Sequence, residues 1–339
     1  MKKQSTALRL FRQLHGQRVR LTVICISIII YVGLEVWTPM YSALVIDQLW
    51  QSIKTGWENE ITFRITWDNM GRELLQLAIQ YFCMWLFYFL QSFLMANVAD
   101  TLVMNLRKQV AAKLNRLPLR FFDQNKAGGI LSRVTSDLEK MSDVMQTGLL
   151  KLIVSIGTII GSICMMFYYS ISLTLLFLAF MLFSAVITWV VSKKSLRFAG
   201  ERMESIGNLT GLAEEYYNGR NVIKAYNHET DSLKKIVQAA EKARIANQRV
   251  EFLSNCVNPL IRLLTRISHA VIALLAGRAL LGGRMTIGVM QALFQHLNLA
   301  SEPLTEASYM LNSMQTAIAA AKRTFALLDE AAGYGFVKG

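Results

Sequence analysis

An acidic residue within an apolar stretch is the first group in this chain that could do chemistry. From Leu21 to Ile46 the only charged side chain is Glu35. A carboxylate inside a bilayer is costly, so by default it marks a functional site. Glu35 could therefore bind cationic groups of a substrate. The alternative is that it lies near the outer end of a membrane helix and is simply hydrated.

A second group of polar side chains lies in an apolar stretch near the C-terminus, at Gln291, Gln295, His296 and Asn298. Residues 291, 295 and 298 share one face of a helix because of the 3.6-residue period. Such a face suits the polar wall of a water-filled cavity. Polar contacts between packed membrane helices are the alternative.

Aromatic residues gather in the second apolar stretch, and among them we select Trp85 and Phe89. Together with the sixteen methionines of the chain they could form an adaptable apolar pocket. The alternative is that most of these side chains face lipid.

No arrangement of residues predicts catalysis or a metal centre. We find no Ser/His/Asp or Cys/His pattern, and the four cysteines lie in apolar stretches without metal-ligand spacing. The phosphate-binding pattern GxxxxGK[ST] and an LSGGQ-like signature are both absent from the sequence. We therefore predict no catalytic residue and no bound cofactor in these 339 residues.

Composition places the chain in a membrane. It is 53% hydrophobic and 17% charged, against roughly 25% charged residues in soluble proteins, and its mean hydropathy is +0.33. The net charge of +13 does not indicate nucleic-acid binding, because the basic residues are spread between apolar segments rather than gathered on one solvated face. A cytosolic enzyme and a disulfide-stapled secreted module are excluded.

The apolar runs predict an all-α membrane protein with six transmembrane helices. A helix needs about 20 apolar residues to cross ~30 Å of hydrocarbon, and the run 152–192 is twice that length, so it must fold back near Tyr168–Ser172. For residues 1–18 we predict an amphipathic interfacial helix, with a solvated basic tail as the alternative. We interpret 331–339 as the start of a linker or as a truncation. The domain 19–330 contains the predicted helices, at about 19–49, 73–116, 137–168, 171–216, 230–281 and 286–328.

The charges of the loops set the orientation. The N-terminal twenty residues and the stretches after the second and fourth helices are basic, whereas 47–73 is mildly acidic. Basic loops stay on the cytoplasmic side, so both termini are expected there. The two inner loops, 100–141 and 193–251, keep a helical pattern interrupted by a short element. The helices therefore project roughly 30 Å into the cytoplasm, and something must be docked at their tips.

Three blocks resemble the transmembrane domain of exporter-type ABC transporters. The first inner loop reads LPLRFFD at 117–123 and GGILSRVTSDLE at 128–139, and the second reads EEYYNGRNVIKAYNHE at 214–229. The exit of the last helix, from Pro303 to Glu330, is also similar to that family. The resemblance extends from about residue 18 to residue 330 and is closest to bacterial multidrug or lipid exporters, which are often heterodimeric.

This resemblance implies how the domain would work. It implies pairing with a second half-transporter, identical or distinct, with the fourth and fifth helices swapped onto the partner's nucleotide-binding domain. That domain, which would hold ATP and Mg, is missing from this chain. The loop tips would be coupling helices: Lys126, Ala127, Gly128, Gly129, Ile130 and Leu131 in the first, and Gly219, Arg220, Asn221, Val222, Ile223, Lys224, Ala225 and Tyr226 in the second.

We therefore expect an ATP-driven exporter of amphipathic drugs, lipids or peptides, working by alternating access in the bacterial inner membrane. Its partners would be the second half-transporter, nucleotide-binding domains and membrane lipids, but no nucleic acid. Two other functions stay open, a membrane scaffold or channel-like subunit and a proton-coupled secondary transporter that uses Glu35 or His296.

Overall fold

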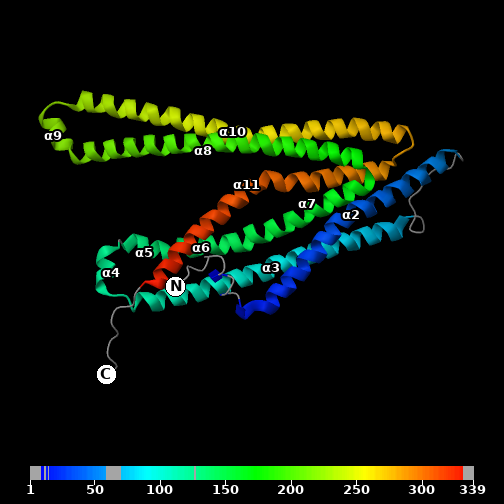
Figure 1. Cartoon of the computed structure of the whole chain (residues 1–339), viewed down its shortest axis with the longest axis horizontal. Coiled ribbons are helices and arrows are strands. Elements are labelled where there is room, and N and C mark those ends of the chain that lie inside the picture. Colours follow the sequence, from blue (N-terminus) through cyan, green and yellow to red (C-terminus); the bar gives the residue numbers. More distant parts are fainter. Residues whose placement is uncertain (1–8, 11–12, 14, 59–69, 126, 331–339) are drawn as a thin grey trace, which may run out of the picture. The chain divides into compact units, whose positions relative to one another are not determined.

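The computed structural model describes residues 9–10, 13, 15–58, 70–125 and 127–330, without the side chains of 15, 192, 196, 254, 257–258, 304–309 and 311–312. In these residues every regular element is helical, as predicted. The chain divides into two compact units, Met1–Ile171 with Ala276–Gly339, and Ser172–Leu275. Each is described by itself (Figure 1).

The first unit contains most of the helices. They are α2 (Arg18–Glu58), α3 (Arg72–Leu114), α4 (Leu119–Gln124), α5 (Ala127–Val134), α6 (Ser136–Asp143), a π-helical segment (Val144–Leu149), α7 (Leu150–Tyr169) and α11 (Ile287–Asp329). A short 3-10 turn, His15–Gln17, precedes α2. The second unit holds α8 (Ile171–Asn218), α9 (Arg220–Ala225) and α10 (Glu229–Leu281), apart from the ends of α8 and α10.

Five helical stretches in the described residues are long and apolar enough to cross a membrane. They are Arg18–Glu58, Arg72–Leu114, Ala127–Tyr169, Ile171–Asn218 and Pro259–Leu281. The sixth predicted crossing corresponds to α11, which has ample length at 43 residues. The first helix continues nine residues past its predicted end at 49, and an i,i+4 ion pair between Lys54 and Glu58 lies in this added part.

The predicted turns lie where the sequence indicated. Ser170 is extended, with φ −163° and ψ 112°, and separates α7 from α8. Gly283 takes a φ of +67° after α10, a conformation that glycine adopts without a Cβ clash. Gly219 separates α8 from α9.

The core of the first unit lies where α2, α3, α6, α7 and α11 meet. Its buried members include Ile28, Leu102, Leu106, Leu138 and Phe325. Two glycines four residues apart let α7 approach α2 closely, as small residues do in membrane helix pairs. A Cβ added at Gly161 would lie 2.7 Å from Val36 Cγ2, and one at Gly157 would lie 3.1 Å from Val32 Cγ1.

The C-terminal part of α2 is joined to the first turn of α11. The Asp47 carboxylate accepts a hydrogen bond from the Gly288 backbone N–H at 2.8 Å and one from Thr286 Oγ1 at 2.6 Å. Thr286 is the N-cap of α11, and its Oγ1 also accepts from the Val289 N–H at 3.2 Å. An acid at this position satisfies free N–H groups and complements the helix dipole. Gly288 packs directly on the Ala43 carbonyl.

An ion pair with a buried carboxylate joins α6 to the C-terminal part of α11. Arg323 donates from Nε to Asp137 Oδ2 at 2.8 Å and from Nη2 to Oδ1 at 2.6 Å. The Asp137 side chain is 2% exposed and that of Arg323 is 48% exposed. The i,i+4 spacing of Arg133 and Asp137 in the sequence predicts an ion pair on one helix face, and this prediction is wrong. The backbone leaves the helical conformation at Thr135 (φ −109°, ψ −86°), so Arg133 belongs to α5 and Asp137 to α6.

The start of the described chain contacts the last turns of α11. Arg9 donates two hydrogen bonds to the Asp329 carboxylate, from Nη1 to Oδ2 at 2.5 Å and from Nη2 to Oδ1 at 2.7 Å. Its guanidinium lies 4.5 Å from the centre of the Phe325 ring. Gln13 and Gln109 exchange side-chain amide hydrogen bonds at 3.3 and 3.1 Å. The rest of the predicted interfacial helix lies largely outside the described residues.

We expect the Arg9–Asp329 contact to weaken in acid. Hydrogen bonding from Arg9 lowers the pKa of the Asp329 carboxyl below its ordinary value of 3.8. The stabilisation is therefore complete above pH ~3.8 and is lost as pH falls through the lower pKa of the folded state. Both side chains are partly exposed, so the effect on unfolding is small. NMR titration of the Asp329 carboxyl, with Arg9→Gln as the control, would measure the shift; an ordinary pKa would contradict it.

A π-helical segment, Val144–Leu149, interrupts the helix that rises from the first inner loop. Polar side chains tie it to α3. Gln146 Nε2 donates to Asp100 Oδ1 at 3.0 Å and to Ser142 Oγ at 2.9 Å, and Ser142 Oγ donates to the same Asp100 oxygen at 3.3 Å. Such segments often lie at functional positions in helices.

The second unit is a long helical hairpin. Figure 1 shows α8 and α10 side by side, with α9 at the tip where the chain reverses. Arg202 Nη1 on α8 donates to Glu251 Oε1 on α10 at 3.3 Å. The small side chains Ala243 and Ala246 are buried, which allows the two helices to lie close together.

Candidate functional site

The candidate residues predicted from the sequence lie in two regions. One is the two loop tips, which contain α4 with α5 and α9, and the other is the apolar part of the first unit. The tips combine short helices with exposed apolar side chains. The apolar part contains polar groups that link α2, α3, α7 and α11. We describe the tips first.

The first tip consists of α4 and α5. Ala127 to Leu131 form the first five residues of α5, whereas Lys126 lies outside the described residues. Ile130 packs against a small cluster of Val110, Phe121 and Leu327. This cluster connects the tip to the C-terminal ends of α3 and α11, so α5 is packed against both helices.

Apolar side chains of the first tip also face outward. Leu119 is 82% exposed and Leu131 is 63% exposed. The residues Ser136 to Glu139 have the sequence pattern of a capping box, which predicts Ser136 as an N-cap. This prediction is wrong, because Ser136 is the first residue inside α6. Its N-cap is Thr135, whose hydroxyl donates back to the Leu131 carbonyl at 2.9 Å instead of capping α6.

The second tip is α9 with its two flanking residues, Gly219 and Tyr226. Arg220 folds back on α8, with its guanidinium 5.2 Å from the centre of the Tyr217 ring and Nη1 donating to the Tyr217 carbonyl at 3.1 Å. None of the residues of α9 is buried. Val222 is 62% exposed and Tyr226 is 73% exposed. The predicted set Gly219–Tyr226 thus coincides with one short, surface-exposed helix.

Glu35 is half-buried and hydrogen-bonded on both carboxylate oxygens. Thr158 of α7 donates from Oγ1 to Oε2 at 2.6 Å, and Tyr31, one turn earlier on α2, donates from its hydroxyl to Oε1 at 3.1 Å. The Tyr31 ring contacts Tyr88 of α3, with ring centres 5.6 Å apart. Three helices, α2, α3 and α7, therefore contribute to this cluster.

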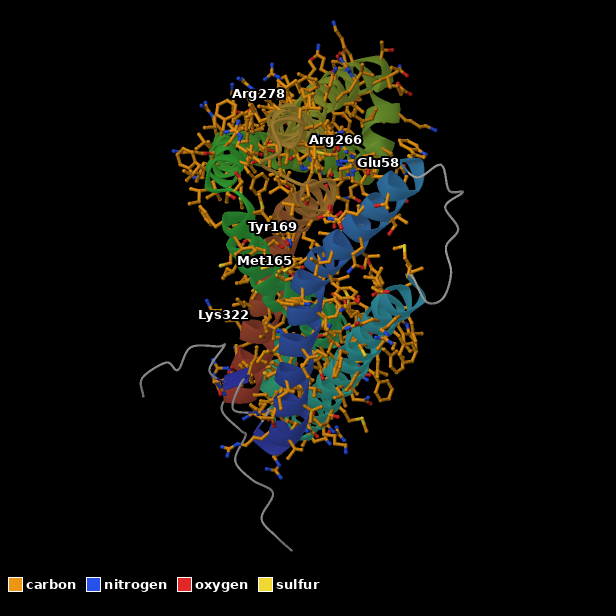
Figure 2. All side chains as sticks on the ribbon, turned by 90° about the vertical axis from the view of Figure 1, so that its right-hand side faces the viewer. Glu58, Met165, Tyr169, Arg266, Arg278 and Lys322 are labelled. Carbon is orange, nitrogen blue, oxygen red and sulfur yellow. The ribbon has the colours of Figure 1, made fainter. Side chains whose placement is uncertain are left out.

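The predicted polar wall on α11 is divided between different surroundings. Gln291 accepts a hydrogen bond from Ser42 Oγ of α2 at 3.3 Å, so it joins two packed helices. His296 is fully buried, and its ring centre lies 5.7 Å from that of Tyr169 at the end of α7. Tyr169 is labelled in Figure 2. Gln295 is half-buried and Asn298 is exposed. Helix packing, the alternative reading, describes Gln291 and His296.

The aromatic residues of α3 form a continuous stacked row. Trp85 lies 5.7 Å from Phe82 and 5.9 Å from Phe89, and Phe89 lies 6.0 Å from Phe93. All four side chains are more than half exposed. Trp85 and Phe89 therefore lie on a different face from the buried groups of the Glu35 cluster.

The sequence alone did not predict several residues that the structure brings to these regions. Thr158 and Tyr31 looked like ordinary residues of apolar runs, and only the fold brings them to Glu35. A usable signal was present for Tyr31, because a residue four positions before Glu35 lies on the same helix face. Asp47 gave no signal, since the loop that follows it is generally acidic.

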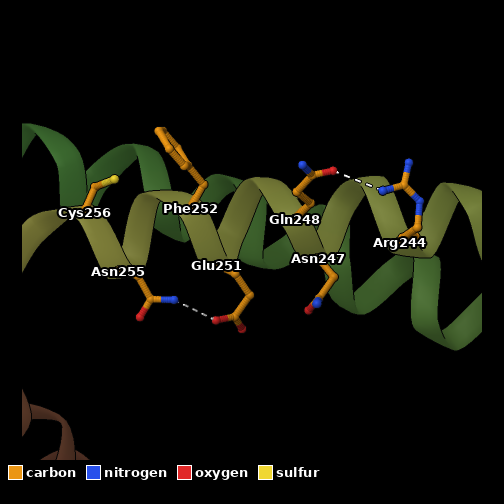
Figure 3. A pocket seen from close by; sticks show the side chains of 7 residues that line it. All are labelled: Arg244, Asn247, Gln248, Glu251, Phe252, Asn255 and Cys256. Atoms are coloured by element: carbon orange, nitrogen blue, oxygen red, sulfur yellow. Dashed lines mark hydrogen bonds between the residues drawn. The ribbon is translucent and has the colours of Figure 1, made fainter.

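A shallow depression of about 460 Å³ lies on the second unit (Figure 3). All of its lining residues come from one face of α10: Arg244, Asn247, Gln248, Glu251, Phe252, Asn255 and Cys256. Its polar groups bond to one another, as in Asn255 Nδ2 to Glu251 Oε2 at 3.2 Å and Arg244 Nη1 to Gln248 Oε1 at 3.2 Å. In the described residues no group of three or more His, Cys, Asp or Glu could hold a metal ion.

Comparison with known proteins identifies the family. The sequence pattern of the ABC transporter transmembrane region matches residues 21–304, which is most of the chain. The chain belongs to the ABC transporter transmembrane family. This agrees with the resemblance of the two inner loops and makes the chain a multi-pass membrane protein.

Relatives of known name support the same family. The chain is 30% identical over 76% of its length to YfiC of Bacillus subtilis, an uncharacterized ABC transporter ATP-binding protein. It is 30% identical over 69% to a fatty acid ABC transporter ATP-binding/permease protein of Mycobacterium bovis. It is 28% identical over 71% to an ATP-dependent lipid A-core flippase of Thiobacillus denitrificans. The matches cover 42%, 37% and 42% of these relatives, so the chain spans less than half of their length.

Proposed function

We propose that this chain is the membrane part of an ATP-driven exporter that moves amphipathic molecules out of the cytoplasm by alternating access. Relatives named for fatty acid and for lipid A-core support a cargo of this kind. ATP and Mg would bind to nucleotide-binding domains, whose phosphate-binding pattern does not occur in these 339 residues. A second half-transporter, identical or distinct, would complete the cavity.

The observation that carries this proposal is the exposed apolar surface at both tips. Leu119 and Leu131 at the first tip, and Val222 and Tyr226 at the second, are more than 60% exposed. Apolar side chains grouped at the end of a projecting helix indicate a docked protein. The first tip is also packed against the inner end of α11 through Ile130 and Leu327. A motor that moves the tip would therefore move α11 as a rigid body.

The loop charges support a location in the bacterial inner membrane, with both termini and both tips on the cytoplasmic side. The inner loops are basic and the stretch 47–73 is mildly acidic. The relatives named above are bacterial.

The function is tested by transport. The complete gene product, with its partner and nucleotide-binding domains, would be reconstituted in liposomes and the movement of a fluorescent phospholipid followed with ATP or a non-hydrolysable analogue. We expect movement with ATP alone. Movement that follows a proton gradient without ATP would replace the proposal with a secondary transporter, and a passive leak would indicate a channel-like subunit.

Docking at the second tip is tested by Val222→Asp. A charge in a buried apolar contact is costly, so we expect transport-coupled ATPase activity to fall by about tenfold or more, with unchanged expression and thermal stability. The matched control is Met203→Asp, at a residue that is 68% exposed but lies on the shaft of α8. Equal effects of the two substitutions would argue against docking at the tip.

A further inference from the structure

Two arginines lie inside a helix segment that is apolar enough to cross a membrane. Arg262 and Arg266 of α10 belong to the candidate span Pro259–Leu281. They are one helical turn apart, so their Cβ atoms lie on one face, about 5–6 Å from each other. Both side chains are exposed, and Arg266 is labelled in Figure 2. Because a guanidinium within a membrane span is costly without compensation, this pair requires a counter-charge.

The two arginines lack a charged partner in the part of the chain that the structure describes. Neither guanidinium donates a hydrogen bond or forms an ion pair with any of these residues. By contrast, Arg202 and Arg244 in the same unit each donate to a glutamate, Glu251 and Glu241 respectively. The charges of the pair on α10 are therefore open to a ligand.

The helices of the second unit supply no acid near this pair. None of the fifty residues after Glu251 is Asp or Glu, and on α8 no acid occurs before Glu201. Glu251 precedes Arg262 by eleven residues, which is about 16 Å along a helix. It also accepts hydrogen bonds from Arg202 and Asn255. This part of α10 therefore carries positive charge that no nearby acid on α8 or α10 balances.

Exposed apolar side chains continue along α10 beside the arginines. Leu263, Ile267 and Leu274 lie on the adjoining face of the helix and are 55%, 43% and 76% exposed. The small side chains of Ala270 and Ala273, which are also exposed, follow directly after the arginines. This side of α10 thus presents cations at one end and an apolar surface beyond them. An amphipathic molecule with an anionic head has the same division into a charged and an apolar part.

We propose that Arg262 and Arg266 bind the phosphate head of an amphipathic lipid, whose tail lies on the adjoining apolar face of α10. A phosphate monoester carries about −1.5 to −2 charges and three acceptor oxygens, which match two guanidinium groups one turn apart. A carboxylate carries one charge and is held by a single guanidinium. The inference rests on the proposed function in one respect, that the domain takes an amphipathic cargo from the membrane. It narrows that cargo to lipids with a phosphate head.

The test compares lipids that differ only in the head group. Lysophosphatidic acid, the monoacylglycerol and the fatty acid of the same chain, each with a fluorophore at the end of the chain, are titrated with the complete transporter in an uncharged maltoside detergent. Fluorescence anisotropy measures their binding. We expect lysophosphatidic acid to bind about tenfold or more tightly than the uncharged monoacylglycerol, as hydrogen bonds to a charged group imply, and more tightly than the fatty acid. Equal affinity of lysophosphatidic acid and either other lipid would overturn the proposal.

Matched variants assign the binding to these arginines. Arg262→Gln and Arg266→Gln should each weaken the binding of lysophosphatidic acid by about tenfold and leave that of the monoacylglycerol unchanged. Arg266→Lys, which keeps the charge but not the planar fork, should lose less than Arg266→Gln. Arg278→Gln is the control, because Arg278 is exposed in the last turn of the same helix and should not contribute. Unchanged binding of lysophosphatidic acid in both Arg262→Gln and Arg266→Gln would contradict the proposal.

Two further outcomes would replace the lipid with another partner. Displacement of the probe by inorganic phosphate at the concentration of the lipid would indicate a site for the free anion. A lower yield of the assembled dimer in Arg262→Gln, together with equal binding of the probes, would indicate an ion pair with the second half-transporter. Either result overturns the proposal.

These measurements need no ATP, so they are independent of the transport assay. If lysophosphatidic acid is preferred while ATP-driven lipid movement is absent, the proposed function fails and the phosphate site stands. If ATP drives transport while the three lipids bind equally, the function stands and the phosphate site fails.

Discussion

Replacing Arg323 with glutamine should destabilise the domain by about 2 kcal/mol. The substitution leaves the Asp137 carboxylate, which is 2% exposed, without its charged partner. Breaking a fully enclosed ion pair costs about 3–5 kcal/mol, and we expect less here because Arg323 is half exposed and water can replace part of it. Thermal unfolding in detergent, followed by circular dichroism, measures the change.

Two variants test this explanation. The double variant Asp137→Asn with Arg323→Gln removes both charges and should recover more than half of the loss, as a coupled pair does in a double-mutant cycle. Arg244→Gln is the matched control, because Arg244 also holds a carboxylate, that of Glu241, with two short hydrogen bonds but on an exposed helix surface. It should have little measurable effect. Equal losses for Arg323→Gln and Arg244→Gln would show that burial of Asp137 is not the cause.

Gly288→Val should destabilise the domain by about 3 kcal/mol or prevent it from folding. A Cβ at Gly288 would meet the Ala43 carbonyl oxygen at 2.0 Å, and a backbone atom cannot turn away as a side chain can. Overpacking costs about 1–3 kcal/mol when neighbours can adjust. The same shift would pull the Gly288 N–H away from Asp47. Expression level and melting temperature measure the result.

Glycine 33 supplies the control for this substitution. It also lies in a helix of the first unit, but nothing is within 4 Å of a Cβ added there. Alanine is a better helix former than glycine, so Gly33→Ala should be neutral or stabilising, whereas Gly288→Ala should already be harmful. A tolerated Gly288→Ala would mean that α2 and α11 are not held in this close contact.

Local signals predicted the helices and their breaks well. The helices and their ends are predicted within a few residues by the uncharged runs of membrane length, by Ser170 after two tyrosines and by the Gly282–Gly283 pair. Propensity and hydropathy act directly at these positions. The end of α2 was the main error, because hydropathy falls after residue 49 whereas helical hydrogen bonding continues to Glu58. The π-helical segment could not be predicted, since its residues are compatible with an ordinary α-helix.

Contacts between residues far apart in the chain could not be predicted from the sequence. Spacing alone favoured Arg133 as the partner of Asp137, but the partner is Arg323, 186 residues away. Spacing left two interpretations open for Gln291, a cavity wall and a helix contact, and only the fold shows that Ser42 of α2 donates a hydrogen bond to it. Glu35 was recognised because an acid in lipid requires an explanation by itself. Its neighbours were not, because Thr158 and Tyr31 are unremarkable until helices meet.

The π-helical segment Val144–Leu149 has a geometric consequence. A π turn holds one residue more than an α turn, so it advances the angular phase of the helix by about 100° between the residues before it and those after it. Asp137 lies before this offset and Thr158 after it. The offset allows one helical rod to present Asp137 to α11 on one side of the π-helical segment and Thr158 to Glu35 of α2 on the other. Loss or migration of the extra residue would act as a rotation rather than a shortening, and would uncouple one of these contacts from the other.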